Sequence, residues 1–253
     1  MMEMARVSTG VEGLDNMLGG GLPFGHSVLV CGGPGSGKTV FGVQFLYQGA
    51  IKYGETGLYV SLDENPSRLK RHVSGFGWDI DKLEKNGKIL VVDASPIRTI
   101  PGEIKVGELS IGKNDFALYS LWAIIRAKAQ EIRAKRVVID PISNLAFQFP
   151  NVSERRRALL DLFQTISDIR VTSLIMTELR STSLARKVRS EEFLSQGVII
   201  FHTLAEGGRI IRAVQIEKMR GVPHDHQLRP YEINEKGIEV FPKESILTIP
   251  KSV

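Results

Sequence analysis

One eight-residue segment constrains the fold of this chain more than any other part of it. Residues 32–39 read Gly-Gly-Pro-Gly-Ser-Gly-Lys-Thr, which is the Gly-x-x-x-x-Gly-Lys-Thr pattern of a phosphate-binding loop. The segment before it, Ser-Val-Leu-Val-Cys, is typical of a buried strand, and the residues after it have helical spacing. The sequence therefore predicts a strand, a tight loop and a helix in succession, which is the first unit of an α/β fold.

The residue types in this loop suit a bound phosphate chain. Backbone N–H groups of a glycine-rich turn can surround an anion, and the start of the following helix adds partial positive charge. The Lys38 ammonium can reach the β- and γ-phosphates, and the Thr39 hydroxyl is a hard oxygen ligand for Mg²⁺. We therefore expect ATP and Mg²⁺ as cofactors. The expected nucleotide-binding positions are Gly32, Gly33, Pro34, Gly35, Ser36, Gly37, Lys38, Thr39 and Val40.

Strands and helices alternate through the first part of the chain. Short β-branched apolar runs predict strands at 26–31, 57–62, 89–92, 136–140 and 171–177. Helices are predicted at 39–52, 66–76, 116–133 and 153–169, with Ser153 as the capping residue of the last one. Such alternation implies βαβ crossovers and a mostly parallel sheet with helices on both faces.

After residue 195 the pattern changes to antiparallel hairpins. One is predicted from 198–202 and 209–217 around Gly207-Gly208, and another from 231–234 and 238–241 around residues 235–237. The predicted fold class is α/β, with a parallel core flanked by helices and extended by hairpins over residues 195–241. We expect one domain over residues 1–253, in which residues 1–25 are a lead-in segment. The irregular stretch 95–115 is expected to be an exposed functional loop.

Composition excludes several classes of protein. No apolar run is long enough for a membrane span, and the first residues lack the basic and apolar regions of a secretory signal. The single cysteine, Cys31, excludes an intrachain disulfide and a Cys-x-x-Cys zinc site. We therefore expect a cytoplasmic protein without a membrane partner. The net charge of +5 does not distinguish a nucleic-acid partner from an ordinary basic surface.

Acidic residues follow two predicted strands at the sheet edge where open α/β folds bind their ligands. Asp140 ends the apolar run 136–140, so its carboxylate would hold Mg²⁺ through water, although a strand-terminal Asp can also serve only as a turn cap. Asp63-Glu64 follows the run 57–62, and a carboxylate there can reach a water in line with the γ-phosphate. From these residues alone, the pair could equally be the acidic start of the next helix.

Several motifs resemble, in order, those of the KaiC-like branch of the RecA-superfamily ATPases. They are Ser8-Thr9-Gly10, Leu14-Asp15, Leu18-Gly19-Gly20-Gly21-Leu22-Pro23-x-Gly25, the helix from Phe41 to Tyr47, Asp63-Glu64-Asn65-Pro66, Phe76-Gly77-Trp78 and Lys218-Met219-Arg220-Gly221-x-x-His224. The resemblance runs from Val7 to about Phe241 and implies a RecA-like P-loop core whose Walker A motif is residues 32–39.

The same resemblance implies an ATPase that assembles as a ring, commonly a hexamer, with ATP between neighbouring subunits. Lys218 and Arg220, which project from one face of a strand, would enter the next subunit's site and neutralise charge on its γ-phosphate. Glu64 would be the catalytic base. The family usually has Glu at the preceding position, where this chain has Asp63, a helper or substitute for the base.

Two further positions follow from the resemblance alone. The family has residues close to the nucleotide at the places that His224 and Glu235 occupy here. With Lys38, the catalytic set is then Glu64, Asp63, Lys38, Lys218 and Arg220, and the metal set is Thr39 and Asp140.

Three functions are compatible with these features. The leading hypothesis is a ring-forming ATPase that converts ATP and water to ADP and phosphate and acts as a timer, switch or regulator. A second is a DNA-binding recombinase-like ATPase, with basic loops near 143–157 and 180–196. A third is a nucleotide-gated interaction module with little turnover, in which 95–115 contacts a partner. The basic residues behind the second hypothesis are Arg155, Arg156, Arg157, Arg180, Arg186, Lys187 and Arg189.

Overall fold

The structure is a computed structural model of the chain. It describes residues 5–95, 103–106, 109–143, 151–179, 190–206 and 209–246.

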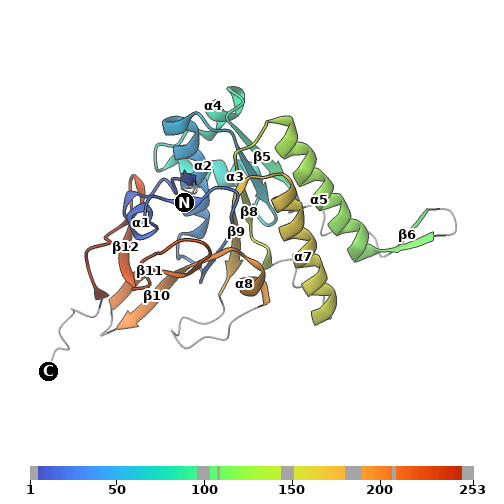
Figure 1. The fold of residues 1–253 in the computed structure, drawn as a ribbon. Coiled ribbons are helices and arrows are strands. Elements are labelled where there is room, and N and C mark those ends of the chain that lie inside the picture. Colours follow the sequence, from blue (N-terminus) through green and yellow to red (C-terminus); the bar gives the residue numbers. More distant parts are fainter. Residues whose placement is uncertain are drawn as a thin grey trace.

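Within these described residues, nine strands form one central sheet in the order β13-β12-β11-β10-β3-β9-β8-β4-β5 (Figure 1). Neighbours from β10 to β5 are parallel, whereas β11, β12 and β13 extend the sheet in antiparallel fashion. The predicted α/β class with an antiparallel C-terminal extension is therefore confirmed. The strands are β3 (Ser27–Gly32), β4 (Gly57–Ser61), β5 (Ile89–Asp93), β8 (Arg136–Asp140), β9 (Thr172–Glu178), β10 (Gly197–Glu206), β11 (Arg209–Met219), β12 (Arg229–Asn234) and β13 (Gly237–Val240).

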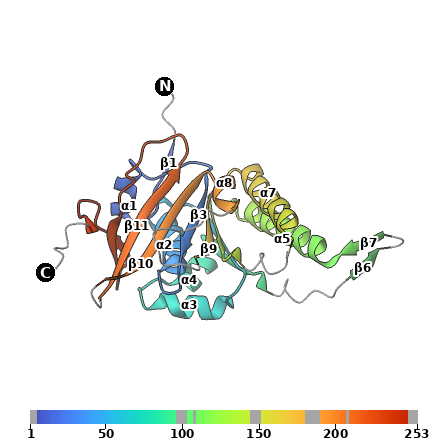
Figure 2. The same cartoon turned by 90° about the horizontal axis from the view of Figure 1, so that it is seen from below.

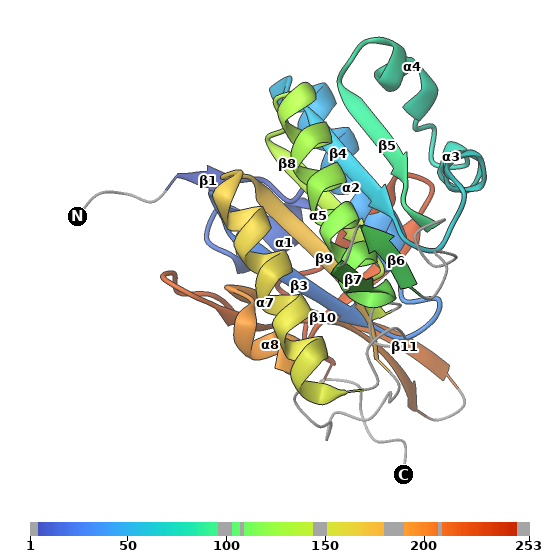
Figure 3. The same ribbon diagram turned by 90° about the vertical axis from the view of Figure 1, so that its right-hand side faces the viewer.

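Helices cover both faces of this sheet, as Figures 2 and 3 show. Helices α1 to α4 pack on one face, and α5, α7 and α8 lie on the other. The bounds are α1 (Glu12–Met17), α2 (Lys38–Tyr53), α3 (Pro66–Ser74), α4 (Ile80–Lys85), α5 (Lys113–Glu131), α7 (Val152–Asp168) and α8 (Ser190–Leu194). This arrangement explains why the central strands are apolar throughout and do not alternate with polar residues.

Strand β3 shows how the two-sided burial works. Val28 and Val30 contact the apolar cluster under α2, whereas Leu29 and Cys31 contact the cluster under α5 and α7. Because successive side chains of a strand point to opposite faces, a continuous apolar run is needed to fill both layers. β3 is thereby held rigidly in the middle of the sheet, where it carries the loop that follows it.

Two small ribbons lie outside the central sheet. β1 (Arg6–Val7) pairs with β2 (Leu22–Pro23) in the lead-in segment, and β6 (Glu103–Val106) pairs with β7 (Leu109–Gly112). Figure 1 shows the second ribbon projecting from the start of α5. The expectation of an irregular stretch at 95–115 was wrong for these strands, because both pair through their backbones. Residues 96–102 and 107–108 lie outside the described part of the chain.

The predicted cap of α7 was also wrong. Asn151 has extended backbone and its Oδ1 accepts the N–H of Ser153 at 2.8 Å, so Asn151 is the N-cap and Ser153 lies inside the first turn. The Gly207-Gly208 turn falls outside the described residues. Among those that are described, none of the helices has the length and apolar composition that a membrane span requires.

Candidate functional site

The phosphate-binding pattern fills the connection between β3 and α2. β3 ends at Gly32 and α2 begins at Lys38, with Gly37 as its N-cap in the left-handed region (φ 85°). Gly35 also has a positive φ of 72°. A Cβ on Gly37 would lie 2.7 Å from Cδ1 of Ile233, so both the backbone angle and the available space require glycine there.

The ammonium of Lys38 lies against the loop itself. Its Nζ donates hydrogen bonds to the carbonyl oxygens of Gly32 (2.9 Å) and Gly33 (3.0 Å). Burial lowers the pKa of Lys38, and the carboxylates of Asp140 and Glu178 oppose that effect. The lysine is thus a partly desolvated cation beside two acids, held at the mouth of the loop.

Asp140 lies at the end of β8, which is separated from β3 by one strand, and its side chain contacts the first turn of α2. Its Oδ2 accepts hydrogen bonds from Thr39 Oγ1 and from the Tyr59 hydroxyl, each at 2.7 Å. Burial raises the pKa of Asp140, whereas these two donors and Lys38 lower it. The pKa of Tyr59 is raised well above its ordinary value by burial and by the adjacent Asp140. The buried carboxylate of Asp140 and the partly buried hydroxyl of Thr39 therefore form a pair of adjoining oxygen atoms.

A pocket of about 440 Å³ opens at this carboxyl edge of the sheet. It brings together Lys38, Thr39, Asp63, Glu64 and Asp140, which were all expected from the sequence and come from separate segments of the chain. Its volume is in the range of small-molecule sites. The lining residues are Lys38, Thr39, Tyr59, Ser61, Asp63, Glu64, Arg68, Asp140, Pro141 and Glu178.

The acid pair lies between β4 and α3. Glu64 is held through its backbone, because Ser61 Oγ accepts its N–H at 3.1 Å and donates to its carbonyl oxygen. The N-cap of α3 is Asn65, whose Oδ1 accepts the N–H of Ser67 at 2.9 Å. The pair therefore does not cap the helix, and the side chains of both acids line the pocket.

The side chains beside the loop suit Mg²⁺ better than a metal ion that is coordinated by protein ligands alone. In the described part of the chain, no group of three or more His, Cys, Asp or Glu side chains is placed to hold a metal ion. Thr39 and Asp140 instead provide one hydroxyl and one carboxylate, both hard oxygen donors, beside the loop. Mg²⁺ commonly binds with one or two such protein ligands and completes its coordination with waters and substrate phosphates.

Lys218 and Arg220 lie at the opposite edge of the sheet. Met219 pairs with Gly197, which pairs in turn with Val28 near the start of β3. From Val28 to Gly32, where the phosphate-binding loop begins, the strand rises by four residues, or about 13 Å. The structure therefore does not bring the two cations to the pocket of their own chain.

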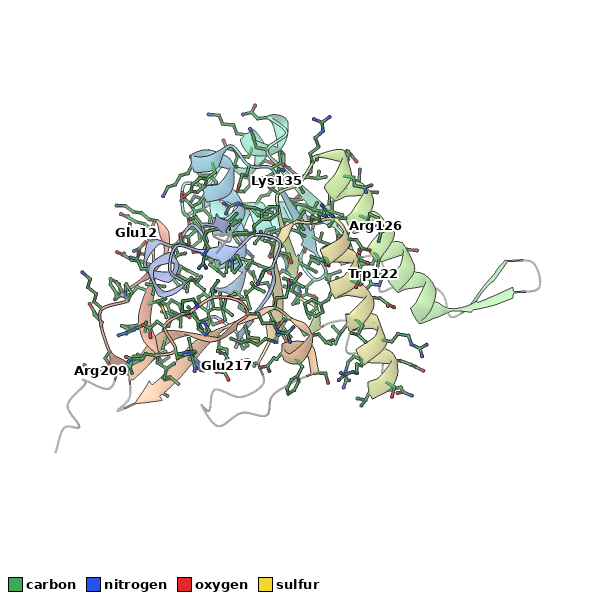
Figure 4. All side chains as sticks on the ribbon, viewed as in Figure 1. Glu12, Trp122, Arg126, Lys135, Arg209 and Glu217 are labelled. Carbon is green, nitrogen blue, oxygen red and sulfur yellow. The ribbon has the colours of Figure 1, made fainter. Side chains whose placement is uncertain are left out.

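Both cations are held by α8. Lys218 Nζ donates to the carbonyl oxygen of Glu192 at 2.6 Å, and Arg220 Nη2 donates to that of Phe193 at 3.2 Å. Glu217, which precedes Lys218 on β11, is labelled in Figure 4. β11 ends at Met219, so the expectation that both residues lie on one strand was wrong for Arg220, although both side chains reach adjacent carbonyl oxygens of α8.

His224 and Glu235 are not among the residues that line the pocket. His224 Nδ1 lies 3.2 Å from the carbonyl oxygen of Val222, and its ring lies 4.3 Å from that of His226. Glu235 is exposed in the turn between β12 and β13. Their proximity to a nucleotide stays a prediction.

Sequence reasoning did not find several of the lining residues. Glu178 carried a usable signal, because it ends the apolar strand β9 just as Asp140 ends β8. Tyr59 and Arg68 carried no such signal, because Tyr59 is one of many residues in apolar strands and Arg68 is one of several basic residues on α3. For these two, only the packing of β4 and α3 against the loop determines that they face the pocket.

Of the two basic segments expected to face DNA, the structure describes part of each, and residues 190–196 of the second contain α8. Arg155, Arg156 and Arg157 lie in the first turns of α7, with the last two exposed. Residues 144–150 and 180–189, including Arg180, Arg186, Lys187 and Arg189, fall outside the described ranges.

Comparison with known proteins gave consistent results. The family model described as "ATPase: KaiC" matches residues 7–245. The circadian clock oscillator protein KaiC of Synechococcus elongatus is 36% identical over 240 residues, which cover 94% of this chain but only 44% of that protein. A UPF0273 protein of Thermotoga maritima is 34% identical over 239 residues, covering 94% of this chain and 97% of the relative.

A solved structure is similar over nearly the whole chain. The crystal structure of a KaiC-like protein from the hyperthermophilic archaeon Pyrococcus horikoshii OT3 superposes with a TM-score of 0.80 and 35% sequence identity. The match covers 95% of this chain and 100% of that one. The chain thus spans less than half of the clock protein's length and nearly all of the shorter relatives.

Proposed function

The chain belongs to the KaiC family of ATPases, and on that premise we propose that it binds ATP with Mg²⁺ in the pocket at the carboxyl edge of its sheet and hydrolyses it to ADP and phosphate. The observation that carries the proposal is the 2.7 Å hydrogen bond between Thr39 and Asp140, beside Lys38 and Glu64 in one pocket. These groups supply, respectively, the metal ligands, a cation for the phosphates and a candidate base.

The loop and its lysine would bind the phosphates. Backbone N–H groups of residue 33 and of residues 35–39 would surround an anion at the start of α2, and Lys38 would exchange its bonds to Gly32 and Gly33 for bonds to phosphate oxygens. Thr39 and Asp140 would hold Mg²⁺, which neutralises charge on the phosphate oxygens when it is bound. The partly desolvated ammonium of Lys38 supports this assignment, because a bound polyanion would compensate its positive charge.

The acid pair would act on water. In this role Glu64 accepts a proton from the attacking water and Asp63, one methylene shorter, assists. The placement of both side chains on the pocket wall supports the assignment, as does the capping of α3 by Asn65. Glu64 is then the general base of the reaction.

The remaining cations would come from a neighbouring subunit. Lys218 and Arg220 lie at the edge of the sheet opposite their own loop, so a ring in which one subunit's amino edge meets the next subunit's pocket would use them. In this hexameric ring each site is shared, and ATP binding and hydrolysis act as a switch or regulator. His224 and Glu235 would approach the nucleotide in that assembly.

The test measures phosphate release and mass together. Full-length protein is assayed for phosphate release with MgATP, and its mass is followed by light scattering with and without MgATP. Lys38→Ala is expected to lower turnover by at least about a hundredfold. Lys52→Ala, on the exposed last turn of the same helix, is the matched control and is expected to keep wild-type turnover.

If Lys38→Ala kept full turnover, the pocket beside the phosphate-binding loop would not be the site of ATP hydrolysis. Assembly driven by MgATP without measurable phosphate release would favour the alternative of a nucleotide-gated interaction module.

The recombinase-like alternative is supported by the exposed Arg156 and Arg157 at the start of α7. A gel shift with single-stranded DNA at low and high salt tests it, since phosphate contacts weaken steeply with salt. The double substitution Arg156→Ala/Arg157→Ala should reduce any such binding, and no shift at low salt would eliminate this function.

A further inference from the structure

A buried tyrosine is hydrogen-bonded to the carboxylate that is proposed to hold Mg²⁺. The hydroxyl of Tyr59 donates to Oδ2 of Asp140 at 2.7 Å, and both residues are buried. The same Oδ2 accepts the hydroxyl of Thr39, also at 2.7 Å. Hydrogen bonds to a charged acceptor are strong, and a buried acceptor that loses a donor is costly. The two donors together therefore hold this carboxylate more firmly than Thr39 alone would.

The packing of β4 against α2 fixes the ring of Tyr59. Tyr59 belongs to the apolar cluster under α2, whereas its neighbours on β4 face the other layer of the sheet. The ring is close to the helix, because a Cβ added to Gly42 would lie 3.8 Å from its Cε2. In the sheet, Tyr59 pairs with Val138, which is two residues before Asp140 on β8. The strand and the helix thus hold the ring in the core and present its hydroxyl to the carboxylate.

The two carboxylate oxygens of Asp140 have different surroundings. Oδ2 accepts both hydrogen bonds, whereas Oδ1 accepts none from the residues that the structure describes. Asp140 lines the pocket together with Lys38 and Thr39. The last torsion of an aspartate side chain has a broad distribution, so rotation about its Cβ–Cγ bond could exchange the two oxygens. The two donors oppose this rotation, because they hold Oδ2 and leave Oδ1 available to a ligand.

We propose that Tyr59 is a positioning residue for the metal ligand Asp140, and this inference rests on the proposed function. By donating to Oδ2, the Tyr59 hydroxyl keeps Oδ1 available to Mg²⁺ or to a water that Mg²⁺ holds. Residues that hydrogen-bond to metal ligands in this way commonly contribute about ten- to a hundredfold in metal affinity or activity. Tyr59 makes no contact with the metal or the nucleotide in this role and acts through Asp140 alone.

The experiment measures nucleotide binding without turnover. The full chain is titrated calorimetrically with the non-hydrolysable β,γ-imido analogue of ATP, once with Mg²⁺ and once with EDTA. The ratio of the two affinities is the Mg²⁺ enhancement. Tyr59→Phe keeps the ring and removes the donor, so it should lower this enhancement about tenfold and leave the affinity in EDTA within about twofold of wild type. Tyr47→Phe removes the hydroxyl of a partly buried tyrosine on α2 that packs against the same apolar cluster, and this matched control should keep the wild-type enhancement.

The titration in EDTA distinguishes positioning of the metal ligand from a general structural role. If Tyr59→Phe lowers the affinity equally with Mg²⁺ and with EDTA, the hydroxyl supports only the fold or the loop, and the inference is wrong. It is equally wrong if Tyr59→Phe keeps the wild-type enhancement. Thermal unfolding of the free protein is measured beside the titrations, and a Tyr59→Phe protein that does not fold would also assign the hydroxyl to stability and overturn the positioning role.

Asp140→Asn separates the inference from the proposed function. If this variant keeps the wild-type enhancement, Asp140 is not a metal ligand, and the proposed roles of Asp140 and Tyr59 both fail. If Asp140→Asn loses the enhancement while Tyr59→Phe keeps it, only the positioning role is wrong and the function stands. In the Asp140→Asn background, Tyr59→Phe should cause no further loss of enhancement, because residues that act as one unit are not additive. An additional tenfold loss there would show that Tyr59 acts independently of Asp140, contrary to the inference.

Discussion

Thr39 and Asp140 are joined by a 2.7 Å hydrogen bond although 101 residues separate them in the sequence. The bond connects the first turn of α2 to the end of β8, and β9 lies between β8 and β3 in the sheet. Tyr59, on the other neighbour of β8, donates to the same carboxylate oxygen. Side chains from α2, β4 and β8 thus meet at one buried oxygen, immediately beside the loop.

Asp140→Asn should reduce the extent to which Mg²⁺ strengthens ATP binding, without changing ATP binding in the absence of Mg²⁺. The amide has the shape of the carboxylate but no charge, so the pocket is preserved while its buried anion is lost. We expect the enhancement of ATP binding by Mg²⁺ to fall by about tenfold or more. Calorimetric titrations with ATP in the presence of Mg²⁺ and of EDTA measure this, and the EDTA titration should be the same for variant and wild type. An unchanged Mg²⁺ enhancement would contradict the role of Asp140.

Mixing two inactive variants should restore activity if sites are shared between subunits. Arg220→Ala keeps Glu64, and Glu64→Gln keeps Arg220, so each variant alone lacks one half of every site and should lose about a thousandfold in rate. In randomly mixed rings, about one interface in four combines the intact halves and should recover about that fraction of wild-type turnover. Phosphate release is measured after mixing at equal concentrations, and a mixture as inactive as its components would exclude a shared site.

Tyr231→Phe should weaken ATP binding without removing activity. The Tyr231 hydroxyl donates at 2.7 Å to the carbonyl oxygen of Ser36, which ties β12 to the phosphate-binding loop. Losing this bond should cost about 1 kcal/mol of stability and raise KM for ATP roughly threefold, because the loop becomes less preorganised. Tyr53→Phe, at an exposed position, is the control. Equal KM values in the two variants would argue against this role of the hydroxyl.

Arg136→Leu should destabilise the fold strongly. Arg136 is 1% exposed, and its guanidinium donates to Glu55 Oε2 at 2.6 Å and to the carbonyl oxygens of Ser8 and Phe45 at 2.7 and 2.9 Å. Leucine leaves these acceptors without a donor, so we expect a loss of about 3 kcal/mol in the free energy of unfolding.

Urea denaturation measures that loss. The control is Lys135→Ala, an exposed substitution next to Arg136 in the sequence, which should change the unfolding free energy by less than about 0.5 kcal/mol. Similar midpoints for the two variants would show that the buried network contributes little.

Features carried by one continuous segment were predictable from the sequence. The strand, loop and helix over residues 27–53 follow from an apolar run, a glycine pattern and helical spacing, all read without knowledge of distant residues. The acid at the end of β8 has the same kind of local signal. The short helices α1, α4 and α8, of five or six residues each, were missed because fewer than two turns show no periodicity.

The cap of α7 illustrates how a local prediction fails by a small displacement. Both Asn151 and Ser153 are good capping residues, and the sequence does not say which of them has extended backbone. The structure assigns that role to Asn151, whose side chain accepts the N–H of Ser153. The residue types limited the N-cap to these two candidates, and the backbone conformation before the helix determined which of them it is.

The phosphate-binding pattern was determined by the sequence alone, since a strand, a glycine-rich turn, a lysine and a threonine lie within one short continuous segment. Only the tertiary structure decided which side chains lie around it. Asp140 accepts a hydrogen bond from Thr39, His72 lies beside Glu64, and Lys218 and Arg220 lie at the opposite edge of the sheet. The physical reason is that these relationships depend on strand order and helix packing. Both are set by contacts between residues far apart in the chain, and the spacing of residues within a motif does not encode them.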